Sequence, residues 1–476
     1  MAIQRLRTGG ADGSYEKMES DPIIFAMRHC LVLLFALAAG GCAMVDPHNV
    51  IGRQFGDASG VATEVVPQPP ARVLDTAARE RAFDFVWSTI HERYYNPALN
   101  GVDWNAVGMR YRPLALAAPD NEAFWDVLDR MTGELRDAHT RVESPRRVEL
   151  RKQEQSISLG FAFQPIEGKL AVSTVIPDSD AWWAGVRPGM TLVTISGEPA
   201  RAAYDRAMAA TRFDSTERSR HVRAMRRLLA GDENTTVDFT FERGDGSRFD
   251  ARLTRRKLST RPAASHRVLP SGFGYLRLTQ WTLGIMPRAM DGLDALKSTP
   301  GIIIDLRGNP GGSLHAVNAM LSRFFPDRTE LGRVLTRTGK PVSLFFGTVE
   351  VIKLKTEVEG DRNAYRGPVV ILVNAQSGSG SEFFAATMQA ARRAAVMGEP
   401  TCGCLLGFLG YARIPGGAEL AYSEVGFVMS NDKRIEGEGV VPDHPVPATI
   451  VDLIVHRDRA LEEAQALLRT LPPWKP

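Results

Sequence analysis

Two segments constrain the fold of this chain most, because in each a fully apolar strand runs into a turn and then into a helix. They are residues 303–312 (IIDLRGNPGG) and residues 372–382 (LVNAQSGSGSE). The first turn presents glycine amides, and the second presents serine hydroxyls at the start of a helix. Acyl transfer needs this combination, since a hydroxyl attacks a carbonyl and backbone N–H donors hold the resulting oxyanion. The pair therefore predicts an α/β core with a nucleophile site.

Length and composition indicate an ordinary multidomain globular protein. The 476 residues suggest two or three domains, and the apolar fraction of 44% and charged fraction of 24% are typical of such proteins. A net charge of +3 gives no reason to expect nucleic acid or an electrostatic membrane surface as a partner. The four cysteines are too few for a disulfide scaffold, and we expect Cys402 and Cys404 to be free thiols or, less favoured, metal ligands. No metal or organic cofactor is expected.

The N-terminal segment predicts export from the cytoplasm. A short basic start at residues 27–29 is followed by an apolar run over residues 30–41, which ends in small residues just before Cys42. This order is typical of a secretory signal, and the run is too short to span a bilayer. We expect residues 1–26 to be a misassigned extension, residues 27–42 to be the signal and residues 43–75 to be a tether.

Cys42 resembles the lipidated cysteine of a bacterial lipobox. It follows small residues, although Ala39 stands three positions before it, where leucine is usual. The alternative is a plain signal peptide that is cut nearby. Both alternatives predict a mature bacterial protein that works outside the cytoplasm, either in the periplasm or at the membrane through a lipid anchor.

Several regions follow the tether. The helical spacing of Phe83, Val86 and Ile90 predicts an N-terminal helical region, and from about residue 266 strands and helices alternate. Strands are expected near residues 272–278, 301–306, 369–374 and 393–398, and helices near residues 314–325, 381–392 and 450–471. The predicted domains are a helical domain at residues 76–150, a second domain at 156–258, an α/β core at 266–450 and a C-terminal helix within 451–476.

Four motifs together resemble peptidase family S41, the tail-specific or C-terminal processing peptidases. Besides the two strand–turn–helix segments, they are DAHT at residues 137–140 and IEGEGVVPD at residues 435–443. The similarity covers roughly residues 76–450. It implies a multidomain α/β protein with an N-terminal helical domain, a PDZ domain and a peptidase core of the ClpP/crotonase-like type.

Residues 156–258 resemble a PDZ domain, through LGFAF at residues 159–163 and AGVRPG at residues 184–189. A PDZ domain binds a peptide as an added strand at a sheet edge, and loop amides often capture the peptide's C-terminal carboxylate. The alternative is a closed PDZ domain that only scaffolds the fold. The resemblance assigns peptide binding to Leu159, Gly160, Phe161, Ala162 and Phe163.

The serine turn offers three hydroxyls, and the resemblance selects Ser379 as the nucleophile because Glu382 follows it by three positions, as in the family motif. A position just before a helix favours negative charge nearby. The backbone N–H groups of Gly311 and Gly380 are expected to form the oxyanion hole, since glycine lets the backbone approach the substrate oxygen. Taken alone, either turn is also compatible with an ordinary structural turn.

One residue of the usual family site is missing. Classical members use a lysine 25 positions after the serine as the base, but this chain has Cys404 there, and Phe408 where an assisting glutamine is usual. A thiol has an ordinary pKa of about 8.5 and carries no positive charge when protonated. A Ser–Lys dyad is therefore excluded on this alignment.

His139 fills the gap, because the tricorn-like branch of the family carries a histidine in an Asp-x-His-Thr motif. Imidazole is suited to act as a base near neutral pH. The resemblance further implies that Glu436 is an acid that orients His139, although a purely structural role for Glu436 is an equal alternative.

The leading hypothesis is an exported serine endopeptidase that cleaves unfolded or C-terminal segments of proteins through a Ser379–His139 acyl-enzyme mechanism. One alternative, motivated by Cys404, is a catalytically inactive relative that binds peptides or apolar ligands. A second alternative makes Cys404 a thiol nucleophile or a redox group, which would need an accessible, electropositive environment. The apolar Leu405 and Leu406 that follow it speak against this alternative. Hydrogen-bond reach between His139 and Ser379 distinguishes the leading hypothesis from the first alternative.

Overall fold

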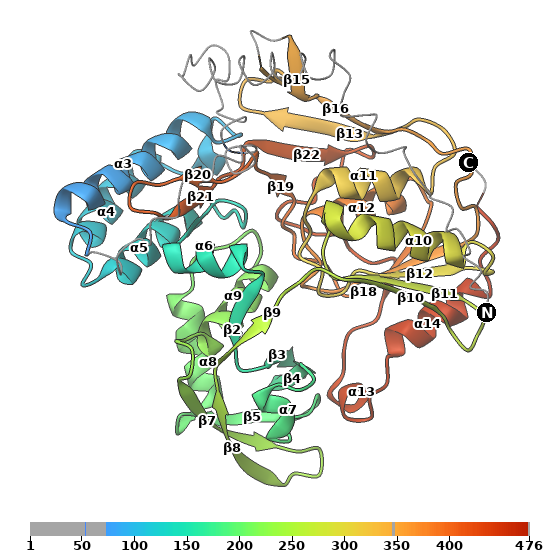
Figure 1. The fold of residues 1–476 in the computed structure, drawn as a ribbon, viewed down its shortest axis with the longest axis horizontal. Helices are drawn as coiled ribbons and strands as arrows, with labels where there is room; N and C mark the ends of the chain where they lie inside the picture. Colours follow the sequence, from blue (N-terminus) through green and yellow to red (C-terminus); the bar gives the residue numbers. More distant parts are fainter. Residues whose placement is uncertain (1–52, 54–72, 345–347, 475–476) are drawn as a thin grey trace, which may run out of the picture. The chain divides into compact units, whose positions relative to one another are not determined.

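A computed structural model describes residues 53, 73–344 and 348–474 of the chain, so the predicted signal segment with Cys42 lies outside the described residues. The chain divides into two compact units, Met1–Thr63 with Val342–Ile352, and Glu64–Pro341 with Lys353–Pro476. In the first unit, the described strands β14 (Val342–Leu344) and β15 (Val349–Ile352) pair antiparallel. All other elements named below belong to the second unit (Figure 1).

The second unit begins with helices that share an apolar core. Phe83, Val86 and Ile90 are buried, as their helical spacing predicts. The same core includes Leu420 and Tyr422 from far along the chain, so these helices are joined to late strands. The elements here are α3 (Thr76–Arg93), η2 (Leu99–Gly101), α4 (Trp104–Leu116), α5 (Asn121–Gly133), β1 (Arg141–Glu143), α6 (Pro145–Lys152), β20 (Ala412–Arg413) and β21 (Glu419–Ala421).

The next region is an antiparallel sheet with packed helices. Its strand order is β3-β4-β5-β7-β8, with β6 paired to β5, so β3 has a neighbour strand on one side only among the described residues. Helix α9 packs against β3. The bounds are β2 (Gln155–Ser158), β3 (Phe161–Ile166), β4 (Lys169–Val175), α7 (Asp180–Trp183), β5 (Thr191–Ile195), β6 (Glu198–Pro199), α8 (Ala200–Ala210), α9 (Glu217–Leu229), β7 (Thr236–Glu242), β8 (Arg248–Thr254) and β9 (Arg256–Ser259), which pairs with β2.

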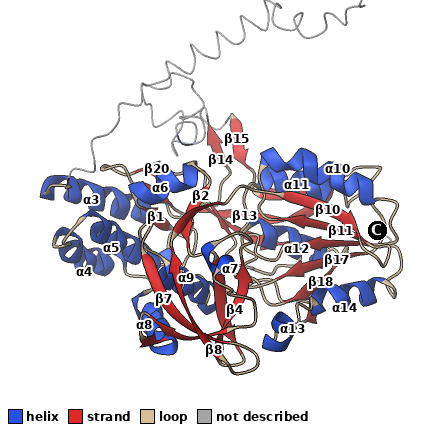
Figure 2. Ribbon diagram, turned by 60° about the horizontal axis from the view of Figure 1, so that its bottom comes forward, coloured by secondary structure: helices blue, strands red, loops and turns tan. Residues whose placement is uncertain are grey.

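A six-stranded sheet of order β10-β11-β12-β17-β18-β23 carries the candidate site. All neighbours are parallel except β10 and β11. Helices α10 and α11 lie on one face and α14 on the other (Figure 2), which explains the uninterrupted apolar run of β17. The bounds are β10 (Ala264–Val268), β11 (Gly274–Leu278), η3 (Leu283–Ile285), α10 (Met286–Leu296), β12 (Ile302–Asp305), α11 (Leu314–Ser322), β17 (Val369–Val373), α12 (Gly380–Ala390), β18 (Ala395–Gly398) and β23 (His444–Pro445).

This arrangement confirms the prediction of a mixed α/β protein, and the four expected strands correspond to β11, β12, β17 and β18. Because β12 and β17 are parallel neighbours, their carboxyl ends lie at the same edge of the sheet. The glycine turn that follows β12 and the serine turn that follows β17 therefore meet.

A further antiparallel sheet, of order β16-β13-β22-β19, was not foreseen from the sequence. Its strands are short or interrupted, and one of them, β13, has a register shift between Glu330 and Gly332. The bounds are β13 (Thr329–Thr336), β16 (Lys355–Val358), β19 (Leu406–Gly407) and β22 (Val425–Met429).

The prediction of one C-terminal helix over residues 450–471 is wrong. The structure has two helices, α13 (Ile450–Ile454) and α14 (Arg459–Leu468). His456 adopts a φ of 54°, which ends the first helix, and the Asp458 side chain accepts the Leu461 N–H to cap the second.

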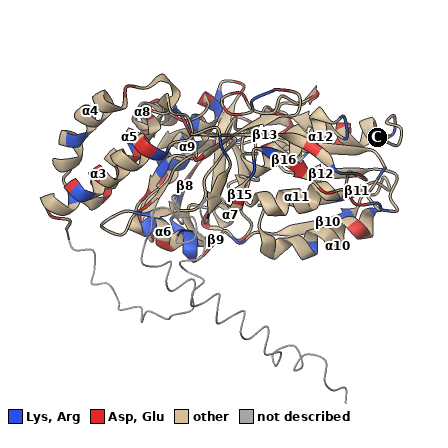
Figure 3. Cartoon of the chain, turned by 90° about the horizontal axis from the view of Figure 1, so that it is seen from above, with Lys and Arg blue, Asp and Glu red and all other residues tan. Residues whose placement is uncertain are grey.

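Charge on the described residues is mixed in sign, with basic and acidic residues interspersed along the elements (Figure 3). This agrees with the small net charge of the chain. In the described part of the chain, none of the helices combines the length and the apolar character that crossing a bilayer requires.

Candidate active site

Ser379 lies in the turn between β17 and α12, in a backbone conformation that residues other than glycine seldom adopt. Its φ is 50° and its ψ is −115°, and such conformations persist only where the surroundings hold them. Here the Ser379 N–H donates to Cys404 O at 3.0 Å and to Glu382 Oε2 at 2.9 Å. The Ser379 hydroxyl lies 3.1 Å from His139 Nε2, within hydrogen-bond distance.

The other two hydroxyls of the serine turn have structural partners. Ser377 Oγ donates to Leu306 O at 2.8 Å, and Ser381 Oγ donates to Asn309 O at 3.1 Å. Both serines are fully buried. They tie the serine turn to the glycine turn after β12, which leaves Ser379 as the hydroxyl of this turn that meets a histidine.

The carboxylate of Glu382 holds the turn in place from inside the protein. It is fully buried and accepts hydrogen bonds from the Ser379 N–H and from three groups of residues 401–404. These are Thr401 Oγ1 at 2.5 Å, the Gly403 N–H at 2.6 Å and the Cys404 N–H at 2.9 Å. Burial raises the pKa of Glu382 to about 7, although these hydrogen bonds oppose the rise. In the sequence, Glu382 served only to mark the motif; its role as the organiser of the turn needs the tertiary structure.

The loop that carries His139 is shaped by the buried carboxylate of Asp137. This carboxylate accepts the His139 N–H at 2.7 Å, the Thr140 hydroxyl at 2.5 Å and the Ser423 hydroxyl at 2.6 Å. Asp137 therefore fixes the backbone that carries His139, and it ties this loop to the residues just before β22.

The imidazole of His139 is buried, and burial lowers its pKa to about 4, against the opposing charge of Asp137. Its Nδ1 has no hydrogen-bond partner among the described residues. The Glu436 carboxylate oxygens are likewise buried and make no hydrogen bond of ordinary geometry in the described part of the chain. Burial and the charge of Asp137 raise the pKa of Glu436 well above its ordinary value. The structure thus brings Ser379 and His139 together, but it does not join Glu436 to His139.

The glycine turn after β12 lies directly against Ser379. A Cβ atom at Gly311 would come within 2.6 Å of Ser379 Cβ and within 2.7 Å of Gly380 N. The Gly311 N–H, however, donates to Asn309 Oδ1 at 2.9 Å, so in this structure it is not open to a substrate oxygen. Gly312 is the adjacent residue, and its N lies 3.4 Å from the position that a Cβ of Gly380 would take. Gly312 is therefore a second candidate, beside Gly311, for the amide that would act together with the Gly380 N–H.

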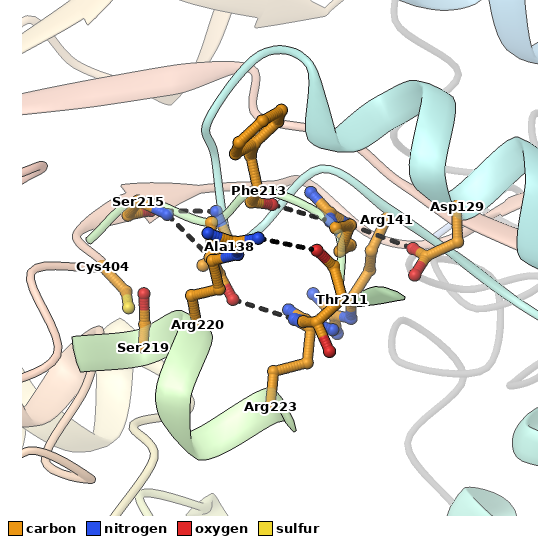
Figure 4. Close-up of polar contacts among 12 residues, drawn as sticks. Asp129, Ala138, Arg141, Thr211, Phe213, Ser215, Ser219, Arg220, Arg223 and Cys404 are labelled. Carbon is orange, nitrogen blue, oxygen red and sulfur yellow. Dashed lines mark hydrogen bonds and ion pairs between the residues drawn. The ribbon is translucent and has the colours of Figure 1, made fainter. Parts of the chain in front are cut away.

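A segment between α8 and α9 holds the loop of His139 through a clamp of hydrogen bonds, and Figure 4 shows Ser215 of this segment beside Ala138 of the loop. The buried Arg212 side chain donates to Asp137 O at 2.8 Å, to Thr140 O at 2.9 Å and to Asp129 Oδ1 at 3.0 Å. Ser215 Oγ accepts the Ala138 N–H at 2.9 Å. Burial alone would raise the pKa of Asp129, but the charges of Arg212 and Arg223 hold it below its ordinary value. Sequence reasoning missed this clamp, because no local pattern links residues so far apart in the chain.

Cys402 and Cys404 form a disulfide with Cα atoms 5.2 Å apart, so the prediction of free thiols is wrong. Gly403 between them has a φ of 73°, a conformation open to glycine. Among residues 53, 73–344 and 348–474, no group of three or more His, Cys, Asp or Glu side chains is arranged to hold a metal ion.

Replacing Arg212 by Met should remove this clamp while nearly preserving volume. We expect the free energy of unfolding to fall by about 3–5 kcal/mol, because the substitution leaves Asp129 buried without its partner. Chemical denaturation measures this loss. Arg227→Met is the matched control, since its ion pair with Asp126 is exposed (45% and 46%) and should contribute about 1 kcal/mol or less. Equal losses in the two variants would contradict the clamp.

Comparison with known proteins finds two family profiles that match parts of this chain. Residues 272–446 match the profile of peptidase family S41, and residues 75–133 match the Tricorn protease C1 domain. The chain is 27% identical to a putative tricorn protease homolog 2 of Streptomyces coelicolor over 437 residues, which covers 85% of this chain but 34% of that protein. It is 26% identical over 412 residues to carboxyl-terminal-processing peptidase 2, chloroplastic, of Arabidopsis thaliana, covering 82% and 72% of the two chains.

Among solved structures, mature CPAF superposes with a TM-score of 0.63 at 15% identity, over 83% of this chain and 98% of that one, which shows a shared fold. The chain spans about a third of the length of its tricorn homologue from Streptomyces. The match over residues 272–446 shows similarity to peptidase family S41, and the chain is homologous to C-terminal processing proteases, which supports a serine-type peptidase.

Proposed function

We propose that this protein is an exported serine endopeptidase that cleaves unfolded or C-terminal segments of other proteins, with Ser379 as nucleophile and His139 as general base. The observation that carries this proposal is the 3.1 Å distance between Ser379 Oγ and His139 Nε2. The names of the carboxyl-terminal-processing relatives support a polypeptide substrate, and the predicted signal at residues 27–42 supports export.

In the proposed reaction, Ser379 Oγ attacks the scissile carbonyl while its proton moves to His139 Nε2. The oxyanion that forms is held by the backbone N–H groups of Gly380 and Gly312, and each such donor contributes roughly 10²–10³-fold to the rate. His139 then gives its proton to the leaving amine. Water attacks the acyl-enzyme in the second half, with His139 again as the base.

We propose that Glu436 supports the loop that carries His139 and is not a charged partner of the His139 side chain. Burial raises the pKa of Glu436 well above its ordinary value, which favours the neutral carboxyl group, and the Ser215 hydroxyl is one of the groups that act on this pKa. Ser215 also accepts the Ala138 N–H, next to His139. Glu436 would thus act on the base through the backbone of this loop.

Peptide capture is proposed for the sheet of residues 161–254, as a PDZ domain. Support comes from the edge position of β3 and from the packing of α9 beside it, since a peptide strand added there would lie between strand and helix. Of the expected loop amides at Leu159, Gly160, Phe161, Ala162 and Phe163, the Gly160 N–H already donates to Ser158 Oγ at 3.0 Å. Phe161, Ala162 and Phe163 lie in strand β3 and pair with β4, so Leu159 supplies the remaining loop amide that we propose as a carboxylate donor.

A second candidate function is ligand binding without catalysis. A cavity of about 410 Å³ lies beside Glu436, and its size suits a small apolar group or an extended side chain. Its apolar lining residues include Tyr95, Val102, Leu135, Leu335, Leu406 and Phe427.

A fluorophosphonate probe tests the proposed mechanism without knowledge of the substrate. We expect the purified protein to be labelled at one serine, and Ser379→Ala and His139→Ala to abolish labelling, because the probe reacts only with an activated hydroxyl. His315→Ala is the matched control, since His315 is exposed on the first turn of α11. Labelling that survives in His139→Ala would exclude this base, and an unlabelled wild type would favour the binding function.

The pH dependence of labelling provides a second test. A base works only while neutral, so the lowered pKa of His139, about 4, extends activity to the acid side of the ordinary value of 6.5. We expect the acid limb of the rate profile near pH 4, measured while circular dichroism shows a folded protein. Glu382, the other titrating group at Ser379, has a pKa of about 7, so a limb near pH 4 is distinct from its titration. A limb near 6.5 or above would contradict the environment assigned to His139.

A further inference from the structure

The disulfide between Cys402 and Cys404 includes the position where the family's usual base would be, and both of its residues contact the serine turn. The Ser379 N–H donates to Cys404 O at 3.0 Å, and the Cys402 N–H donates to Ser377 O at 3.0 Å. The disulfide therefore restrains the turn of residues 402–404, and this turn holds the serine turn by hydrogen bonds to Ser377 and Ser379.

The same turn also positions Glu382. Its Gly403 and Cys404 N–H groups supply two of the hydrogen bonds that this buried carboxylate accepts, and Glu382 in turn accepts the Ser379 N–H. Thr216, at the start of α9, donates its hydroxyl to Cys402 O at 2.6 Å. A change in the conformation of residues 402–404 would thus reach Ser379 by two routes, directly through Cys404 O and indirectly through Glu382.

The two sulfur-bearing residues differ in exposure. Cys404 is 4% exposed, whereas Cys402 is only partly buried. Thiol–disulfide exchange needs an attacking thiolate to reach one sulfur along the disulfide axis. Cys402 is the more exposed residue of the pair, so its sulfur is the expected point of attack.

We propose that Cys402 and Cys404 form a reversible thiol–disulfide exchange site, and that a dithiol reductant acting there lowers the reactivity of Ser379. A thiolate of the reductant attacks Cys402 Sγ and breaks the bond to Cys404 Sγ, which takes the electron pair and then a proton. The second thiol of the reductant attacks the mixed disulfide, releases the Cys402 thiol and leaves the reductant as a disulfide. The cystine is reduced by two electrons and the dithiol is oxidised by two. This proposal rests on the proposed serine peptidase function for its effect, but not for its chemistry.

The direction of the effect follows from the restraint. The oxidised pair limits residues 402–404 to conformations near the one that holds Ser379 in its unfavourable backbone geometry. Reduction removes this limit, so Ser379 spends less time aligned with His139. The oxidised, active form fits an exported protein, because disulfides persist in oxidising compartments.

The test uses the purified full-length protein, treated with dithiothreitol or left oxidised. Alkylation followed by tryptic digestion should find Cys402 and Cys404 blocked before reduction and both alkylated after it; one tryptic peptide, residues 394–413, carries the pair. The rate of fluorophosphonate labelling should fall by about tenfold on reduction and recover on reoxidation, since small displacements of reacting groups have effects of this size or larger. Alkylation of both cysteines without reduction would overturn the proposal.

The double variant Cys402→Ser/Cys404→Ser is the matched control. Its labelling rate should resemble that of the reduced protein and should not respond to dithiothreitol; an equal response would mean that the reductant acts elsewhere, which would overturn the proposal. If no form is labelled, the proposed peptidase mechanism fails, and hydrogen exchange of the amides of residues 377–384 then decides the redox proposal. Faster exchange after reduction supports it, and unchanged exchange overturns it.

Discussion

The buried carboxylate of Glu382 is the interaction on which the rest of the site depends. It receives hydrogen bonds from the nucleophile's own N–H, from Thr401 and from two amides of the turn at residues 402–404. A buried carboxyl group is costly unless its oxygens are satisfied, so the surrounding backbone is fixed by its presence. That backbone holds Ser379 in a conformation that the residue would not adopt by itself.

A second set of buried contacts holds His139, the proposed base, beside Ser379. The Asp137 carboxylate accepts the backbone N–H of His139 within the same loop. Arg212, in the segment between α8 and α9, donates to carbonyl groups of this loop. Because Ser379 lies in the turn after β17 of the core sheet, the Ser379–His139 distance depends on the packing of regions that the sequence presents as separate domains. The proposed peptide-binding sheet is adjacent along the chain to this clamp, since Arg212 lies between its helices α8 and α9.

Cys404 in place of the usual lysine changes the chemistry of this position, but the residue still contacts the site. A lysine there would supply a proton acceptor, whereas Cys404 contributes a backbone carbonyl to Ser379, an amide to Glu382 and one half of a disulfide. In the proposed mechanism, proton transfer is assigned to His139, whose pKa burial lowers to about 4. The position thus retains its contact with the nucleophile while its side chain takes on a structural, reducible role.

The sequence by itself determined the mixed α/β class, the main strands of the core and the two turns, and it predicted Ser379 and His139 as site residues, because apolar runs, glycine and serine turns and motif spacing are local signals. Only the tertiary structure decided what lies across from each turn. It showed that the Gly311 amide is already occupied, that Cys402 and Cys404 are joined, and that the C-terminal helix breaks at His456. The first two features join residues only two positions apart, and the third is a single backbone angle. Each depends on the backbone conformation of a turn, which the contacts of the folded chain set and the order of residues does not reveal.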